Sequence, residues 1–140
     1  MSIAAIMAPV FAQVALTFAV LIGVGSSRYT AVKAGEVKVN DIALSSDGWS
    51  VKIRKISNNY NNQMQLPLML YIVVAFFILL GKVDLVAVVL AWAFVASRYV
   101  HTFIHVGSNA LARRFRVFLI GAVIMMSLWV WLALRFYLIG

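Results

Sequence analysis

The chain has 140 residues, close to the ~150 residues of an average domain, so we expect a single domain. Hydrophobic residues make up 64% of it, charged residues only 11%, and the mean hydropathy is +0.99, which excludes a soluble globular protein and a disordered one. Because the chain has no cysteine, a disulfide scaffold, thiolate catalysis by the protein and cysteine-ligated metals are excluded too. The composition indicates an integral membrane protein whose formal net charge of +8 lies in short polar stretches.

Four long apolar segments divide the chain. A helix needs about 20 apolar residues to cross a hydrocarbon core of about 30 Å, and each segment is long enough. Because the apolar runs are continuous, they favour helices over the alternating strands of a β-barrel. We therefore predict an all-α, multi-pass four-helix bundle that forms one transmembrane domain over residues 1–140. The predicted helices cover residues 3–25, 58–80, 83–106 and 115–138.

One sizeable polar loop, residues 26–56, separates the first two predicted helices. It contains six of the twelve Lys and Arg residues, and three more, Arg113, Arg114 and Arg116, lie around the start of the last helix. Because Lys and Arg gather on cytoplasmic loops, we expect both regions in the cytoplasm and both termini outside, in a bacterial inner membrane. This topology and the anionic headgroups of the lipid bilayer account for the positive charge, so we expect no nucleic-acid partner.

The third predicted helix carries a polar stripe. It consists of Arg98, His101, His105 and Asn109. Their spacing of three, four and four residues keeps them within about 80° of one helix face. Since all four acidic residues lie in loops or at a helix boundary, Arg98 has no evident ion-pair partner and should bind backbone carbonyls or an anion. Two histidines four residues apart could hold a metal, but no third ligand is evident, so we expect no metal site.

The second predicted helix begins with another polar stripe. It consists of Asn58, Asn61, Asn62 and Gln65. These residues share about 100° of one helix face. Asn and Gln in membrane helices often serve as hydrogen-bonding partners of neighbouring helices, and this structural role is an alternative to ligand binding. We expect the two stripes to face each other or a subunit interface, with the Arg113-Arg114 pair within reach of their cytoplasmic ends.

Together these residues resemble the MAPEG family, the membrane-associated proteins in eicosanoid and glutathione metabolism. The resemblance rests on Asn62-Gln63-Met64-Gln65-Leu66-Pro67 in the second helix, Arg98-Tyr99-Val100-His101 and His105 in the third, and an arginine at the fourth. It covers essentially the whole chain by helix count and loop pattern, and its specific part runs from about residue 58 to 121. The resemblance implies four-helix subunits that form a homotrimer, with glutathione bound at the subunit interface near the cytoplasmic side.

The resemblance also implies roles for individual residues. Asn62 matches the asparagine that contacts glutathione, and Pro67 matches the proline that follows it in an N-x-x-E-x-P-like motif. Arg98 and His101 match the R-x-x-H motif of the prostaglandin-synthase branch. Arg114 stands where that branch has the arginine that stabilises the thiolate.

Three positions depart from the family pattern. Asn58 replaces an arginine, Gln65 replaces the glutamate of the motif, and His105 replaces a tyrosine. Glutathione carries two carboxylates and one ammonium, so its site should offer both cations and a carboxylate. Gln65 can accept a hydrogen bond from the ammonium but cannot neutralise it, and a charge-assisted hydrogen bond is roughly twice as strong as a neutral one. The cationic half of the site is therefore the better preserved half.

Two hypotheses about function follow. In the first, the protein is a glutathione-dependent transferase or peroxidase that acts on lipophilic electrophiles arriving from the bilayer. The catalytic roles then fall to Arg114, His101 and His105, and the binding of glutathione to Asn62, Gln65 and Arg98. In the second, the protein is a non-enzymatic membrane subunit or scaffold that has lost the catalytic set, as the replaced glutamate and tyrosine suggest. Binding of a lipid anion or small molecule without turnover is a third reading.

Overall fold

The computed structural model describes residues 1–139, and Gly140, the last residue of the predicted domain, lies outside the described part. The helices are α1 (Ile3–Lys33), α2 (Val39–Ile42), α3 (Val51–Gln63), α4 (Leu66–Leu79), α5 (Leu85–Val106) and α6 (Leu111–Tyr137). Four stretches of these residues are long and apolar enough to cross a membrane, namely α1, α3 with α4, α5 and α6. The prediction of an all-α four-helix bundle is confirmed.

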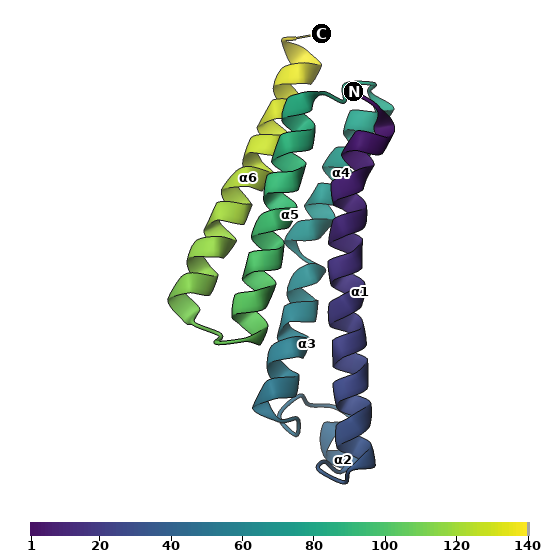
Figure 1. Ribbon diagram of the computed structural model, residues 1–140, viewed down its shortest axis with the longest axis vertical. Coiled ribbons are helices and arrows are strands. Elements are labelled where there is room, and N and C mark those ends of the chain that lie inside the picture. The colour runs from purple at the N-terminus through teal and green to yellow at the C-terminus, as the bar shows by residue number, and fades with distance from the viewer. Residues whose placement is uncertain (140) are drawn as a thin grey trace.

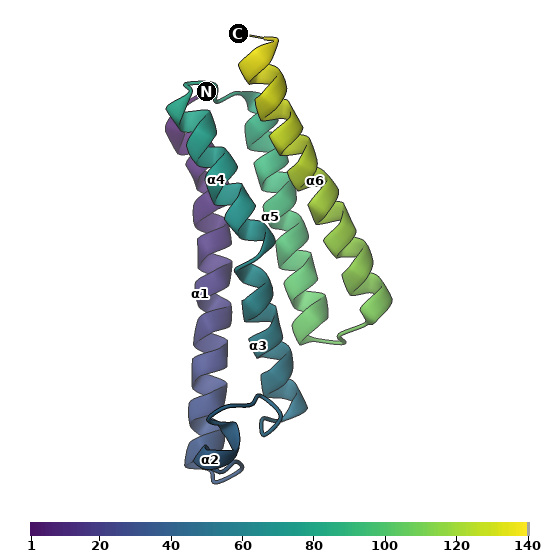
Figure 2. The ribbon, with the colours of Figure 1, turned by 180° about the vertical axis from the view of Figure 1, so that it is seen from behind.

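The four spans run antiparallel along the length of the molecule (Figure 1). The start of α1 and the end of α6 lie at one end, which we call the terminal end, and α2 lies at the opposite end, which we call the loop end (Figure 1). Helix α5 packs against α6, α1 and α3, while α4 packs against α6 and α1. The view from behind shows α3 and α4 following one another beside α1 (Figure 2). A site at the loop end can therefore draw on α1, α3, α5 and α6.

The second span is interrupted in its middle. Helix α3 ends at Gln63 and α4 begins at Leu66, with Pro67 in its first turn, where the missing N–H of proline is not needed. The proline ring disfavours helical conformation at the residue before it, so one helix does not continue smoothly through this point. Gln65 departs from helical geometry with φ −98° and ψ −98°. The break separates a polar half-span, α3, from an apolar half-span, α4.

The helices reach farther toward the loop end than predicted. The first continues to residue 33 instead of 25, the second span starts at residue 51 instead of 58, and the last helix starts at residue 111 instead of 115. Apolar runs mark only the residues in hydrocarbon, whereas Lys and Arg are also good helix formers in water. Ser50 stabilises the early start of α3 because its hydroxyl accepts a hydrogen bond from the backbone N–H of Ile53. The predicted loop of residues 26–56 is therefore shorter, residues 34–50, and contains α2.

An apolar core fills the terminal half of the bundle. Its fully buried members include Ile6, Leu70, Val73, Phe77, Ala87, Ala91, Phe94 and Leu128. Gly121 allows α6 to approach α5 closely, because a Cβ atom there would lie 2.8 Å from Ser97 Oγ. At the terminal end, the Asp84 carboxylate caps α5, accepts hydrogen bonds from Trp131 Nε1 at 3.0 and 3.1 Å, and lies 3.1 Å from Arg135 Nε. These contacts fix α5, which carries the candidate site, against α6.

Candidate functional site

The polar stripe of α5 faces the inside of the bundle. Arg98, His101 and His105 are only 1%, 2% and 2% exposed, so they share one buried face as their spacing predicts. At 1.5 Å per residue, Arg98 lies about 20 Å from the start of α5, within a hydrocarbon core of about 30 Å. Asn109, the fourth residue of the predicted stripe, lies beyond the end of α5 in a turn with a positive φ of 51°. The buried stripe therefore consists of one cation and two imidazoles.

A network of hydrogen-bonded side chains connects this stripe to α1 and α3. Gln13 Nε2 donates to Gln63 Oε1 at 2.7 Å, and Gln63 Nε2 donates to Asn59 Oδ1 at 3.2 Å. Gln63 Nε2 also donates to Thr102 Oγ1 at 3.1 Å, and the Thr102 hydroxyl donates to Asn59 Oδ1 at 3.4 Å. Asn59 Nδ2 lies 3.4 Å from Nδ1 of His105. The network joins three helices and ends on a candidate catalytic histidine.

The stripe predicted on the second span meets α5 at one residue only. Asn62 is half-buried, and its Nδ2 lies 3.4 Å from His105 Nδ1. Asn58, Asn61 and Gln65 are exposed on the single chain. Of the two placements predicted for this stripe, contact with α5 therefore holds for Asn62 alone, because the packing of α3 turns the other three side chains outward. Their placement at a subunit interface stays a prediction.

The amide side chains that α3 buries, Asn59 and Gln63, do not belong to the predicted stripe. Asn59 and Gln63 are 0% and 1% exposed and lie four residues apart on one face. Gln13, which is 0% exposed, is the single amide side chain in α1. Gln13 was the sequence signal that could have identified Asn59 and Gln63. An unpaired amide in hydrocarbon is costly, so a lone amide in an apolar helix requires a buried polar partner on another helix.

Arg114 is held at the start of α6. It is half-buried, and its Nη1 donates to Asn109 Oδ1 at 2.8 Å, across the turn that connects α5 to α6. Arg113 and Arg116, by contrast, are exposed. The structure thus distinguishes Arg114 from its exposed neighbours and fixes it at the loop end, where the last turn of α5 carries His105.

The two histidines lie against each other. The rings of His101 and His105 meet edge to face, with centroids 5.6 Å apart. The ring of Phe118 from α6 packs on His101 with a centroid distance of 6.3 Å. Within residues 1–139, no group of three or more His, Cys, Asp or Glu side chains is placed to hold a metal ion. The pair is arranged to donate and accept hydrogen bonds in an enclosed site.

Arg98 is the least satisfied side chain of the site. Its Nε, Nη1 and Nη2 are all buried without a hydrogen-bond partner among residues 1–139, and so is Nδ1 of His101. Asp84, the acidic residue at the start of α5, lies 14 residues earlier, about 21 Å along the helix. An unpaired buried cation costs several kcal/mol, so a single chain is incomplete at this point. A ligand anion or polar groups of a second subunit would complete it.

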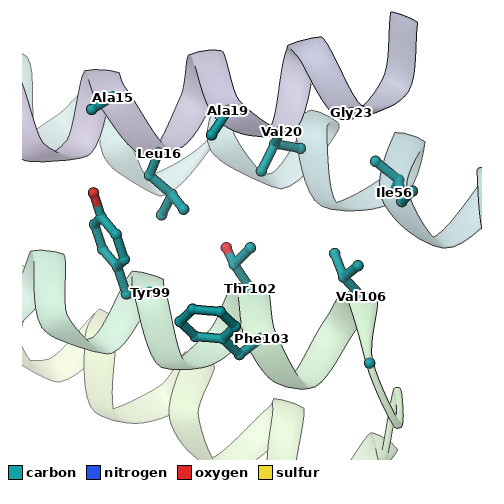
Figure 3. Close-up of a pocket in the computed structure, with 11 residues that line it drawn as sticks. Ala15, Leu16, Ala19, Val20, Gly23, Ile56, Tyr99, Thr102, Phe103 and Val106 are labelled. Carbon is teal, nitrogen blue, oxygen red and sulfur yellow. The ribbon is translucent and has the colours of Figure 1, made fainter. Parts of the chain in front are cut away.

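A separate apolar groove of about 700 Å³ lies between α1 and α5 (Figure 3). Leu16, Ala19 and Val20 line it from α1, and Tyr99 and Phe103 line it from α5 (Figure 3). At 100° per residue, the groove side of α5 is about 130° away from the side that carries the arginine and the histidines. The groove and the polar site therefore occupy different faces of α5.

The hydrogen bonds of Asn59 predict the protonation pattern of His105. Because Asn59 Oδ1 accepts from both Gln63 and Thr102, its Nδ2 is the atom that faces His105 Nδ1. Nδ1 must therefore accept, which leaves the proton of the imidazole on Nε2. Nitrogen NMR of histidine-labelled protein should show this tautomer for His105, identified by comparison with a His101→Gln variant.

Asn59→Asp should reverse the direction of the hydrogen bond to His105 Nδ1, because a carboxylate accepts hydrogen bonds and cannot donate them. We expect this variant to place a proton on Nδ1 of His105, whereas Asn61→Asp, at an exposed position of the same helix, should leave the spectrum unchanged. A proton on Nδ1 in the wild-type protein would contradict the orientation of the network.

A model of the MAPEG family matches residues 6–134, nearly the whole chain. Searches of curated proteins and of solved structures gave no match. The matched region includes all four spans and every residue of the candidate site.

Proposed function

The chain belongs to the MAPEG family, membrane proteins of glutathione and eicosanoid metabolism, and on this premise we propose that it is a glutathione-dependent transferase or peroxidase acting on lipophilic electrophiles. The observation that carries the proposal is Arg98, a buried guanidinium at membrane depth whose three nitrogens have no hydrogen-bond partner among the described residues 1–139. A carboxylate of glutathione is an anion of the kind that this cation requires. The integral, multi-pass architecture supports a co-substrate that arrives from the bilayer.

In the proposed complex, the peptide is held from two helices. Arg98 on α5 binds a carboxylate of glutathione, and Asn62 on α3 supplies a hydrogen bond beside His105. Gln65 stands at the break between α3 and α4, where its amide oxygen can accept from the ammonium of the ligand. Binding therefore relies mainly on the cationic side of the site.

Arg114 is the proposed thiolate-stabilising residue. The thiolate is the nucleophile, and a cation beside a thiol of ordinary pKa ~8.5 favours its ionised form. Helix α6 begins at Leu111, and its N-cap residue, Ala110, has no side chain that could cap it, so the first backbone N–H groups and the positive end of the helix dipole favour an anion at the same place. The thiolate attacks the electrophilic carbon and forms a carbon–sulfur bond. In a substitution, the bond to the leaving group breaks and the leaving group departs with the electron pair. In an addition, a π bond of the electrophile breaks and its electron pair moves to a neighbouring atom, which is then protonated. His101 or His105 receives the thiol proton or delivers a proton to the product.

We expect the site to be completed in a homotrimer. Asn58, Asn61 and Gln65 are exposed on the single chain, and at 1.5 Å per residue α4 places Gln65 about 21 Å from the terminal end, inside the hydrocarbon. Polar side chains exposed to lipid are costly, so a neighbouring subunit should cover them. Native mass spectrometry in mild detergent should show three copies. A stable monomer that still binds glutathione would contradict the interfacial site.

A non-enzymatic subunit or scaffold is the alternative function, and Gln65 and His105 in place of the family's glutamate and tyrosine favour it. Gln65→Glu distinguishes the two, because a carboxylate can neutralise the ammonium of glutathione. If the site binds glutathione, calorimetry should show about fivefold tighter binding for this variant, the gain of a charge-assisted over a neutral hydrogen bond.

Asn61→Asp is the matched control, because it adds the same charge at an exposed position of α3 and should leave the affinity unchanged. The absence of binding in the wild type and in Gln65→Glu would support the scaffold and contradict the enzyme. Equal gains in both variants would show that only the net charge matters.

A further inference from the structure

The groove between α1 and α5 offers a ligand no free hydrogen-bonding group. Two of the lining residues, Tyr99 and Thr102, carry hydroxyl groups (Figure 3). Both hydroxyls form hydrogen bonds within the protein. The Tyr99 hydroxyl donates to the carbonyl of Ala12 at 2.8 Å. The Thr102 hydroxyl donates to Asn59 Oδ1 and accepts from Gln63. An occupant must therefore be apolar along the length of the groove.

The dimensions of the groove match one leaflet of a bilayer. Its α1 wall runs from Ala15 to Gly23, and its opposite wall runs from Tyr99 on α5 to Gly107 just after that helix. Each wall spans eight steps of 1.5 Å, or about 12 Å. Half of a hydrocarbon core of about 30 Å is about 15 Å. Since Tyr99 lies about 21 Å from the start of α5, the groove lies in the leaflet nearer the loop end. On its rim, the Phe103 side chain is 74% exposed.

Positive charge stands at the loop end of the groove. Lys55 Nζ donates to the carbonyl of Gly107, a lining residue, at 3.4 Å. Among residues 1–139, Lys55 forms no ion pair with a carboxylate. Its charge remains available to an anionic group at the membrane surface.

We propose that this groove is a binding site for one anionic phospholipid, with an acyl chain between α1 and α5 and the phosphate beside Lys55. The apolar lining favours an acyl chain, the length of the groove fits a lipid of one leaflet, and the lysine favours an anionic headgroup. The site lies on a different face of α5 from Arg98 and the histidines, so it does not depend on the proposed glutathione chemistry.

The test is a competition between two lipids of identical acyl chains. Delipidated protein in mixed micelles of equal phosphatidylglycerol and phosphatidylcholine is analysed by native mass spectrometry. We expect one retained lipid per chain, with about fivefold preference for phosphatidylglycerol, the effect of about one lysine near the surface. Ala19→Leu fills the groove from its exposed wall and should abolish retention of both lipids. Lys55→Gln should keep retention but remove the preference.

Ala112→Leu, at an exposed position of α6 outside the groove, makes the same change in volume and should retain lipid like the wild type. Circular dichroism of each variant verifies that the bundle is folded. Unchanged lipid retention in folded Ala19→Leu would overturn the proposal. A change in the number of subunits in that variant would assign the groove to a second copy of the chain, and displacement of the lipid by a lipophilic electrophile would assign it to the co-substrate.

Discussion

Replacing Arg114 by alanine should lower the turnover of glutathione with a lipophilic test electrophile by about 10²-fold or more. This is the scale of the loss when one group that stabilises a developing oxyanion is removed, and we expect a similar role toward the thiolate. Arg114 is half-buried at the start of α6 and is fixed by its hydrogen bond to Asn109. Initial rates at saturating glutathione measure the effect on the chemical step.

Arg113→Ala is the matched control, since Arg113 is one residue away but exposed. It should change turnover little, because its side chain points about 100° around α6 from that of Arg114. Equal losses in both variants, or no loss in either, would show that the arginines serve topology and membrane anchoring instead of catalysis.

Arg98→Met should affect stability and binding in opposite directions. Removing an unpaired buried charge and replacing it with an apolar side chain should stabilise the ligand-free protein by about 2 kcal/mol or more. The same variant should lose the stabilisation that an excess of glutathione gives the wild type through mass action. Unfolding by a denaturing detergent, followed by circular dichroism with and without glutathione, measures both effects.

Arg98→Lys keeps the charge, so it should not gain the stability of Arg98→Met and should keep part of the response to glutathione. If Arg98→Met is less stable than the wild type and still responds to glutathione, Arg98 is a structural contact between subunits and not a ligand-binding residue.

The four spans and the stripe on α5 could be predicted because each follows from a strong physical constraint. Hydrocarbon requires long apolar helices, and this fixes the number of spans. Arg98, His101 and His105 are isolated polar residues in an otherwise apolar helix, so their helical spacing leaves one face for them to share. The helix ends at the loop end could not be predicted in this way. Outside the hydrocarbon, charged residues occur both in helices and in loops, so the sequence shows no change from apolar to polar residues where a helix ends.

The inward face of α3 was harder to predict because the helix carries amide side chains on several of its faces. Residues 58, 59, 61, 62 and 63 are all Asn or Gln, so any rotation of α3 turns an amide inward. The rotation is set by apolar packing instead. Ile53 and Ile56 are buried, and Asn59 and Gln63 continue the same face at helical spacing. The break at Pro67 had a signal in the sequence, but its effect on the continuity of the span emerges only in the structure.

The most direct test of the central claim is the ultraviolet absorbance of the glutathione thiolate during titration of the wild-type protein at neutral pH. The account predicts a saturable thiolate signal that is absent in Arg114→Ala and unchanged in Arg113→Ala, because Arg114 favours the ionised thiol. A wild-type protein that shows no thiolate signal at any glutathione concentration would contradict it.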